Sequence, residues 1–187
     1  MRNNLGIQDN HLVILFAGKF EEKKDPQILM DAFLSLNRRD LHLLFVGNGA
    51  LEAKLKAQAK DNRNIHFMDF QNQSKMPAVY QCCDLFCLPS MGPNETWGLA
   101  VNEAMASGKA ILASDAVGCA TDLVKIEYNG AIFKAREIDS ILARLQHLTE
   151  DKARLVNYGE QSRIMIKDWN FTNIVETIEN KLLNETH

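Results

Sequence analysis

The sequence has no long hydrophobic run and no excess of positive charge. Its longest uninterrupted apolar stretch is the six residues Leu12–Ala17, far short of the ~20 that are needed to cross a bilayer. No charged segment at the amino terminus leads into an apolar one, so no signal peptide is expected. Lys and Arg number 21 against 24 Asp and Glu, a net charge of −3, whereas general nucleic-acid binders carry a basic excess. We therefore expect a soluble, cytoplasmic protein that binds no nucleic acid.

Cysteine is scarce, and its spacing does not favour metal or redox chemistry. Cys82 and Cys83 are adjacent, Cys87 follows closely, Cys119 stands alone, and no C-x-x-C pair occurs. The first three lie in an apolar stretch, which predicts buried thiols that act as small hydrophobic side chains. None of the histidines lies in a candidate loop beside a nucleophile, so all five are predicted to be structural or solvated: His11, His42, His66, His147 and His187.

Short apolar runs alternate with helical patterns along the 187 residues, of which 46% are apolar and 24% charged. At about 150 residues per domain, this length predicts one domain over 1–187. Runs of strand length lie at 12–17, 41–46, 65–68, 84–88, 110–113 and 131–133. Helical patterns lie at 26–36, 50–59, 75–82, 98–107, 138–149, 151–167 and 171–183. The alternation predicts an α/β, Rossmann-like doubly wound parallel sheet of about six strands with helices on both faces.

In such a sheet, ligands bind beyond the carboxyl ends of the strands. This rule selects four loops, at 18–25, 47–49, 69–73 and 89–98. The loop 47–49 is a weak candidate, because a tight turn between strand and helix explains its two glycines without any ligand.

The first of these loops combines a glycine with lysines before a helix. Gly18 lets the backbone approach a ligand closely, and lysines such as Lys19 and Lys24 beside a helix N-terminus suit a phosphate. The alternative is a solvated charged loop, since Glu21 and Glu22 cancel much of the positive charge. From this loop alone both interpretations stay open.

The fourth loop carries two carboxylates, Glu95 and Glu103, with seven residues between them. Gly98 and Leu99 lie between them at the predicted start of a helix, where a charge of about +0.5 favours a diphosphate. Carboxylates on either side would accept hydrogen bonds from hydroxyl groups, a layout that describes a nucleotide sugar. The alternative is that Glu95 stabilises the helix dipole and Glu103 lies on a solvated face. A glycosidase pair is less favoured, because no apolar pocket is evident that would raise one pKa.

Several segments together resemble the retaining glycosyltransferases of family 4. The resemblance runs from about residue 12 to 180, and the stretch with the two glutamates is its most specific part. It is carried by Gly18-Lys19 with Lys24, and by 46–49 (VGNG), 65–70 (IHFMDF), 83–90 (CDLFCLPS), 95–108 (ETWGLAVNEAMASG), 113–118 (ASDAVG) and 129–130 (NG).

The resemblance implies the donor-binding, carboxyl-terminal half of a GT-B fold. In this family Lys19 and Lys24 would neutralise the leaving nucleoside diphosphate, and Glu95 would contact the donor sugar near its anomeric carbon. These three are the expected catalytic residues.

The same resemblance assigns the expected donor-binding residues. Glu103 would hold the ribose hydroxyls, the backbone of Gly98 and Leu99 would bind the diphosphate, and the backbone around Phe70 and Gln71 would read the base. The family needs no cofactor and no divalent metal, which agrees with the absence of a D-x-D pair in the sequence.

By the resemblance, the enzyme transfers a hexose with retention to a saccharide or lipid-linked acceptor, as in polysaccharide biosynthesis. UDP-hexoses such as UDP-glucose are favoured as donor, with GDP-mannose second. The acceptor-binding amino-terminal half of such an enzyme is absent from this chain, so the isolated chain is expected to bind nucleotide and be largely inactive. Peripheral membrane association of the intact enzyme stays open. The alternatives are a non-catalytic GT-B-like binding module, or half of a nucleotide-sugar epimerase.

Overall fold

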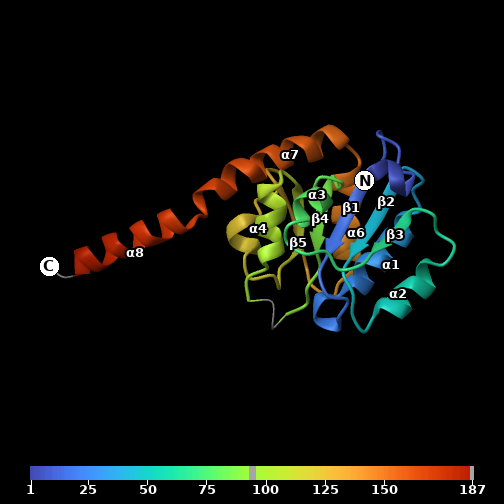
Figure 1. Ribbon diagram of the computed structural model, residues 1–187, viewed down its shortest axis with the longest axis horizontal. Coiled ribbons are helices and arrows are strands. Elements are labelled where there is room, and N and C mark those ends of the chain that lie inside the picture. Colours follow the sequence, from blue (N-terminus) through green and yellow to red (C-terminus); the bar gives the residue numbers. More distant parts are fainter. Residues whose placement is uncertain (93–95, 186–187) are drawn as a thin grey trace.

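A computed structural model of the chain describes residues 1–92 and 96–185 (Figure 1). At its centre lies a parallel sheet of six strands in the order β3-β2-β1-β4-β5-β6. The strands are β1 (Leu12–Ala17), β2 (Leu41–Val46), β3 (Ile65–Met68), β4 (Leu85–Leu88), β5 (Ala110–Ser114) and β6 (Gly130–Phe133). The doubly wound α/β fold expected from the sequence is therefore confirmed.

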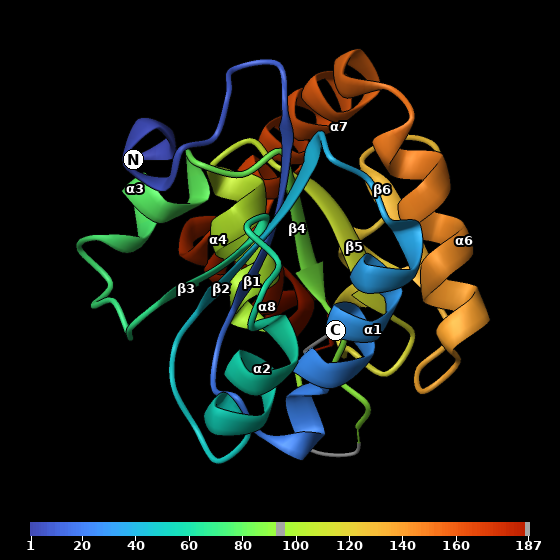
Figure 2. The same cartoon turned by 90° about the vertical axis from the view of Figure 1, so that its right-hand side faces the viewer.

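Helices cover both faces of this sheet (Figure 2). One face packs against α1 (Pro26–Leu36), α2 (Glu52–Ala59) and α6 (Ile138–Thr149), and the other packs against α3 (Met76–Tyr80), α4 (Leu99–Ala106) and α5 (Ala120–Leu123). In β1, Ile14 and Phe16 point to the first layer, whereas Val13 and Leu15 point to the second. Because both faces are covered, β1 and β4 are apolar throughout, whereas β2 and β3 each carry one histidine, His42 and His66.

The helix α1 begins as its sequence predicts. Pro26 occupies the first turn, and the side chain of Asp25 accepts a hydrogen bond from the amide of Ile28 at 3.2 Å. The helix expected over 75–82 is shorter, because the chain after Tyr80 closes with turns: the amide of Cys82 donates to the carbonyl of Val79 at 3.0 Å. Such i→i+3 bonds tighten a helix end instead of extending it.

Several helical segments differ from the sequence pattern. The helix expected over 151–167 divides into α7 (Lys152–Met165) and a 3₁₀ turn, η3 (Ile166–Asp168). Two further 3₁₀ turns, η1 (Arg2–Leu5) and η2 (Glu22–Lys24), and the short helix α5 were not predicted, because one turn of helix leaves no periodic pattern.

All four cysteines are buried, as expected for Cys82, Cys83 and Cys87. Burial raises the pKa of these three thiols, that of Cys83 to about 12. The thiols of Cys82, Cys83 and Cys87 are therefore protonated at neutral pH and serve as parts of the core.

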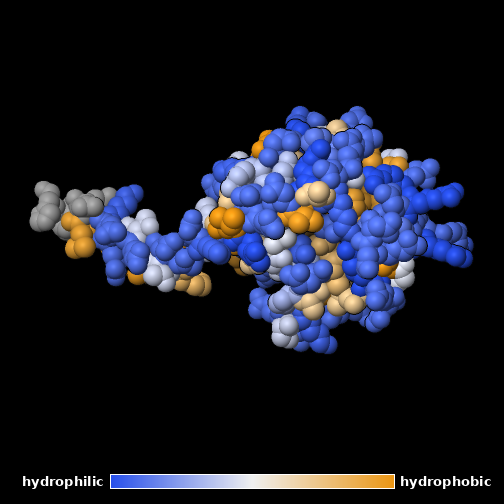
Figure 3. Space-filling view, turned by 90° about the horizontal axis from the view of Figure 1, so that it is seen from above, coloured by the Kyte–Doolittle hydropathy of each residue, from blue (hydrophilic) through white to orange (hydrophobic). Residues whose placement is uncertain are grey.

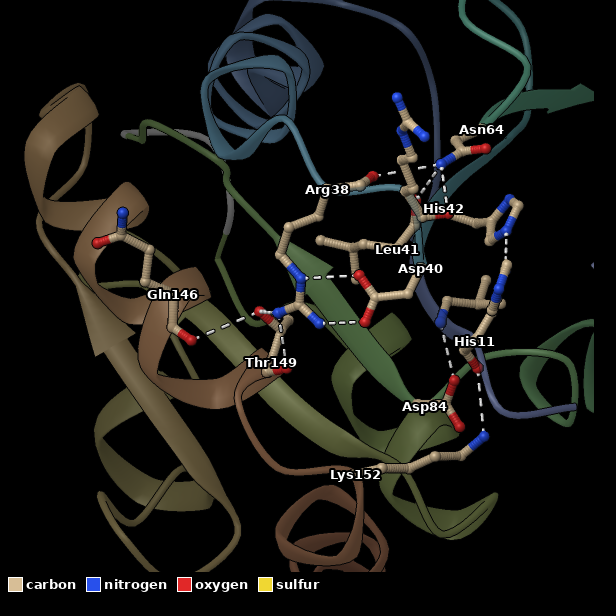
Figure 4. Close-up of polar contacts among 12 residues, drawn as sticks. His11, Arg38, Asp40, Leu41, His42, Asn64, Asp84, Gln146, Thr149 and Lys152 are labelled. Atoms are coloured by element: carbon tan, nitrogen blue, oxygen red, sulfur yellow. Dashed lines mark hydrogen bonds and ion pairs between the residues drawn. The ribbon is translucent and has the colours of Figure 1, made fainter. Parts of the chain in front are cut away.

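The amino-terminal edge of the sheet carries a polar network (Figure 4). The guanidinium of Arg38 pairs with Asp40 and also donates to the carbonyl and hydroxyl oxygens of Thr149, at 2.8 and 3.0 Å. The side-chain amide of Asn64 donates to the carbonyls of Arg39 and Leu41, at 3.1 and 3.0 Å. The network ties the start of β2 to the end of α6 and to the start of β3.

Three histidines form a stack at the same edge. The imidazole of His42 lies 2.9 Å from His11 (Nε2 to Nδ1) and 3.0 Å from His66 (Nδ1 to Nε2), with ring centroids 5.1 and 5.3 Å apart. These three histidines are therefore structural, as expected. Burial, the neighbouring His66 and His11, and Arg2 lower the pKa of His42 to about 4.

The last helix, α8 (Phe171–Glu185), projects away from the body of the molecule (Figure 1). Trp169, just before it, packs on Trp97 with ring centroids 5.4 Å apart. Apolar side chains recur along α8 and are exposed, between 48% for Ile174 and 87% for Phe171, and they are visible as orange patches on the projecting helix in Figure 3. Across the described ranges, no helix is both long and apolar enough to cross a membrane.

We predict that the free energy of unfolding falls as the pH is lowered from about 6.5 to about 4. In this window the unfolded chain protonates His42, with an ordinary pKa of 6.5, whereas the folded chain resists protonation until about pH 4. The unfolded state thus binds more protons, and linkage makes stability decrease with falling pH. Urea titrations at several pH values should give a shallower pH dependence for His42→Gln. Equal slopes for the two proteins would contradict this role of His42.

We also predict that deleting residues 171–187 changes the free energy of unfolding by less than about 1 kcal/mol. None of the described side chains of α8 is buried, so the deletion removes little packed surface. As a control, deletion from residue 152 also removes Leu155 and Tyr158, which are 2% and 4% exposed, and should destabilise the fold strongly. A large loss of stability from the shorter deletion would show that α8 packs on the body.

Candidate functional site

The loops that follow β1 and β2 are packed tightly against each other at the carboxyl edge of the sheet. The amide of Gly18 donates to the carbonyl of Val46 at 3.0 Å. Gly47 has a φ of +140°, and a Cβ atom on it would lie 2.0 Å from the carbonyl oxygen of Gly18. Glycine is therefore required at position 47 by backbone packing, which agrees with the turn interpretation of loop 47–49.

A cavity of about 280 Å³ opens at this edge. It joins the loops after β1, β2 and β3 to one side of α4, so three of the four predicted loops meet there. It is lined by Ala17, Gly18, Lys19, Val46, Gly47, Asn48, Phe70, Gln71, Gln73, Met76, Tyr80, Ala100 and Glu103.

Five of the nine predicted site residues line this cavity, namely Gly18, Lys19, Phe70, Gln71 and Glu103. Lys24, Gly98 and Leu99 are not among its lining residues. Glu95 lies outside the described residues. The structure thus brings together the part of the predicted set that the resemblance assigns to ribose and base, along with one of the two lysines.

The lysines of the first loop share a carboxylate. The ammonium group of Lys19 lies 3.7 Å from a carboxylate oxygen of Glu21, and that of Lys23 lies 3.3 Å from the other oxygen. Lys19 is 73% exposed, so this pair is weakly held and its lysine is available to another anion. Lys24 is half-buried and is the last residue of the turn η2, separated from α1 by Asp25. The charge cancellation anticipated for this loop is present for Glu21, whereas Glu22 is exposed to solvent.

The first turn of α4 is held by packing rather than by a side-chain cap. Gly98 has a φ of +101°, and a Cβ atom there would lie 2.8 Å from Cγ1 of Val117. The neighbouring amide of Cys119 donates to the carbonyl of Trp97 at 2.9 Å. Among the residues described, no side chain caps the helix, and Leu99 is 70% exposed. No described side chain therefore satisfies the first amides of α4, and a helix N-terminus favours an anion.

Glu103 lies one turn and a half further along α4, and its carboxylate reaches the cavity. Its Oε2 accepts a hydrogen bond of 2.8 Å from the hydroxyl of Tyr80. Tyr80 is 1% exposed, and burial together with the charge of Glu103 raises its pKa above the ordinary range, so its hydroxyl is the donor. Tyr80 was not foreseen from the sequence. The sequence signal that could have indicated this contact was a tyrosine at an apolar helical position, because a buried tyrosine hydroxyl needs a hydrogen-bond partner.

The loop after β3 forms another part of the cavity lining. Phe70 is 68% exposed at the rim, and the side-chain amide of Gln71 donates to the carbonyl of Asp69 at 2.9 Å. Met76 and Tyr80 add apolar surface below them. A flat ring can bind against such a wall while an attached polyol reaches Glu103.

The geometry offers no cluster of metal ligands. Within 1–92 and 96–185, no group of three or more His, Cys, Asp or Glu side chains is placed to hold a metal ion. The charged residues that line the cavity are Lys19 and Glu103. Such an arrangement suits a ligand with an anionic centre and neutral hydroxyl groups.

The chain is similar in sequence and in fold to several known proteins. The chain is 28% identical over 154 residues to an uncharacterized glycosyltransferase of Methanocaldococcus jannaschii. This alignment covers 80% of this chain and 39% of that protein. It is 29% identical over 170 residues to the D-inositol 3-phosphate glycosyltransferase of Nocardia farcinica, and this alignment covers 84% of this chain and 37% of that protein. The chain thus spans about two fifths of the length of the curated relatives it matches.

The fold is shared with the Anabaena protein HepE, whose crystal structure is in complex with UDP and glucose. The TM-score is 0.80 at 23% identity, over 97% of this chain and 50% of that protein. A family model described as glycosyl transferases group 1 matches residues 1–165. Because this match covers most of its length, the chain belongs to the glycosyl transferases of group 1.

Proposed function

We propose that this chain is the donor-binding part of a retaining glycosyltransferase that takes a hexose from a nucleotide sugar. The observation that supports this most is one cavity whose lining includes both Lys19 and Glu103, beside the first turn of α4. This cavity lies at the carboxyl edge of a doubly wound sheet, where nucleotides bind in folds of this type.

In this proposal the diphosphate lies between the first loop and α4. Lys19 and Lys24 neutralise the negative charge that develops on the leaving diphosphate, and the amides of Gly98 and Leu99 donate hydrogen bonds to it. Gly18 allows the backbone to approach the ligand. The lysines and the helix would replace a divalent metal, and no other cofactor is proposed.

The nucleoside would occupy the rest of the cavity. Its base lies against the loop of Phe70 and Gln71, and its ribose hydroxyls donate to the carboxylate of Glu103. Glu95 is proposed to accept hydrogen bonds from the donor sugar, near the carbon that is attacked. UDP-hexose is the first choice of donor, since HepE has been crystallised with UDP and glucose, and GDP-mannose is the second.

Transfer would require more polypeptide than this chain contains. The relatives are more than twice as long, so we propose that their remaining residues supply the site for a saccharide or lipid-linked acceptor. The isolated chain would then bind donor but transfer little sugar.

Calorimetric titration of the chain with UDP, GDP and ADP, each with and without an attached hexose, tests the proposal. We expect clear binding of one nucleotide, unchanged by EDTA because no metal takes part. Failure of all three to bind would contradict the donor site, and loss of binding in EDTA would contradict its metal-free character.

A charge-removing variant tests the first loop. Lys19→Ala should weaken binding of the preferred nucleoside diphosphate about tenfold, because a charge-assisted hydrogen bond to phosphate is lost. Lys54→Ala is the matched control: it removes the same charge from an exposed site on α2, away from the cavity, and should bind normally. Equal affinities of the two variants would contradict the role of Lys19.

A further inference from the structure

The contact between Tyr80 and Glu103 joins two elements that lie on the same face of the sheet. Tyr80 is the last residue of α3, and Glu103 lies in the middle of α4. The hydroxyl of Tyr80 donates to Oε2 of Glu103 at 2.8 Å and lies 3.5 Å from the carbonyl of Ala100. Both residues line the cavity.

The ring of Tyr80 is itself fixed. It is 1% exposed and packs edge-on against Phe86 of β4, with ring centroids 5.7 Å apart and planes at 71°. A hydroxyl on a ring held in this way has one position, so it can orient a flexible partner. It is also a dependable donor, because a buried tyrosine beside a carboxylate does not ionise at neutral pH.

Glu103 is the flexible partner. Its carboxylate is half-buried, and among the described side chains only Tyr80 donates to it, through Oε2. The other oxygen, Oε1, is left for a donor from outside the protein. A free glutamate side chain loses rotamer entropy when it binds a ligand, and prior fixation reduces that cost.

We propose that Tyr80 is a positioning residue of the donor site: its hydroxyl fixes the carboxylate of Glu103 so that Oε1 meets the vicinal hydroxyls of a ribose. This rests on the proposed function, because it takes Glu103 as the ribose-binding residue. Tyr80 would thus act on the ligand through Glu103, and its effect should depend on the ribose hydroxyls.

The test compares the preferred nucleoside diphosphate with its 2′,3′-dideoxy form by calorimetric titration. The wild-type chain should bind the dideoxy form more than tenfold more weakly, because the carboxylate then lacks its partners. Tyr80→Phe should bind the ribose form about fivefold more weakly than the wild type, the value of one hydrogen bond. Its affinity for the dideoxy form should be unchanged.

The chain contains a matched control. Tyr158 also donates a hydrogen bond to a glutamate, Glu127 Oε2 at 3.0 Å, outside the cavity lining. Tyr158→Phe should leave both affinities unchanged. In the background of Glu103→Ala, Tyr80→Phe should have no further effect, and this comparison also shows whether the variant keeps a functional fold.

Two results would overturn the inference alone: equal loss of affinity for both ligands in Tyr80→Phe, or no loss for either, while the wild type still discriminates between them. A wild-type chain that binds neither ligand, or that binds both equally, would instead overturn the proposed ribose site and the inference with it.

Discussion

The central position of β1, paired with β2 on one side and β4 on the other, is the constraint on which the rest of the structure depends. From β1 the chain moves outward to β2 and β3, and then returns across the sheet to β4 and continues to β5 and β6. The parallel registers, such as Ile14 opposite both Leu43 and Leu85, bring the ends of these strands to one edge. The loops after β1, β2 and β3 and the helix after β4 must therefore surround the same space, which is where the cavity lies.

The polar groups at the amino and carboxyl edges of the sheet differ in their contacts. At the amino edge, polar side chains bond to one another and to the backbone: a carboxylate oxygen of Asp84 accepts from the amide of Val13 at 2.8 Å and from Arg2 at 2.9 Å, and His42 lies within hydrogen-bond distance of His11 and His66. At the carboxyl edge, no described side chain caps α4, and the side chain of Lys19 is 73% exposed.

The charged side chains of Lys19 and Glu103 at the carboxyl edge each contact another side chain. Lys19 has Glu21 within 3.7 Å at an exposed position, where an ion pair is screened and easily exchanged for a better partner. Glu103 is held from a buried side by Tyr80, where a hydrogen bond is stronger and more lasting. The ion pair with Glu21 therefore leaves the ammonium group of Lys19 available, whereas the hydrogen bond from Tyr80 gives the carboxylate of Glu103 one orientation.

Local patterns in the sequence determined the strands, the beginning of α1 at Asp25 and Pro26, and the four loops beyond the strand ends. These features depend on the periodicity of apolar residues and on helix capping, and both involve residues that are close together in the sequence. The family resemblance added Phe70 and Gln71 and assigned roles to residues such as Lys19 and Glu103. The sequence alone therefore determined the class of fold and five of the residues that line the cavity.

Tertiary structure alone decided the contacts between distant residues. Tyr80 and Glu103 are 23 positions apart, and His11 and His42 are 31 apart. Nothing in the local pattern at either position indicates its partner, because the distance between them is set by the packing of α3, α4 and the sheet. The requirement for glycine at position 47 likewise comes from the carbonyl of Gly18 on a neighbouring strand end. Such contacts arise only when the strand order is established, since strand pairing is what brings these segments together.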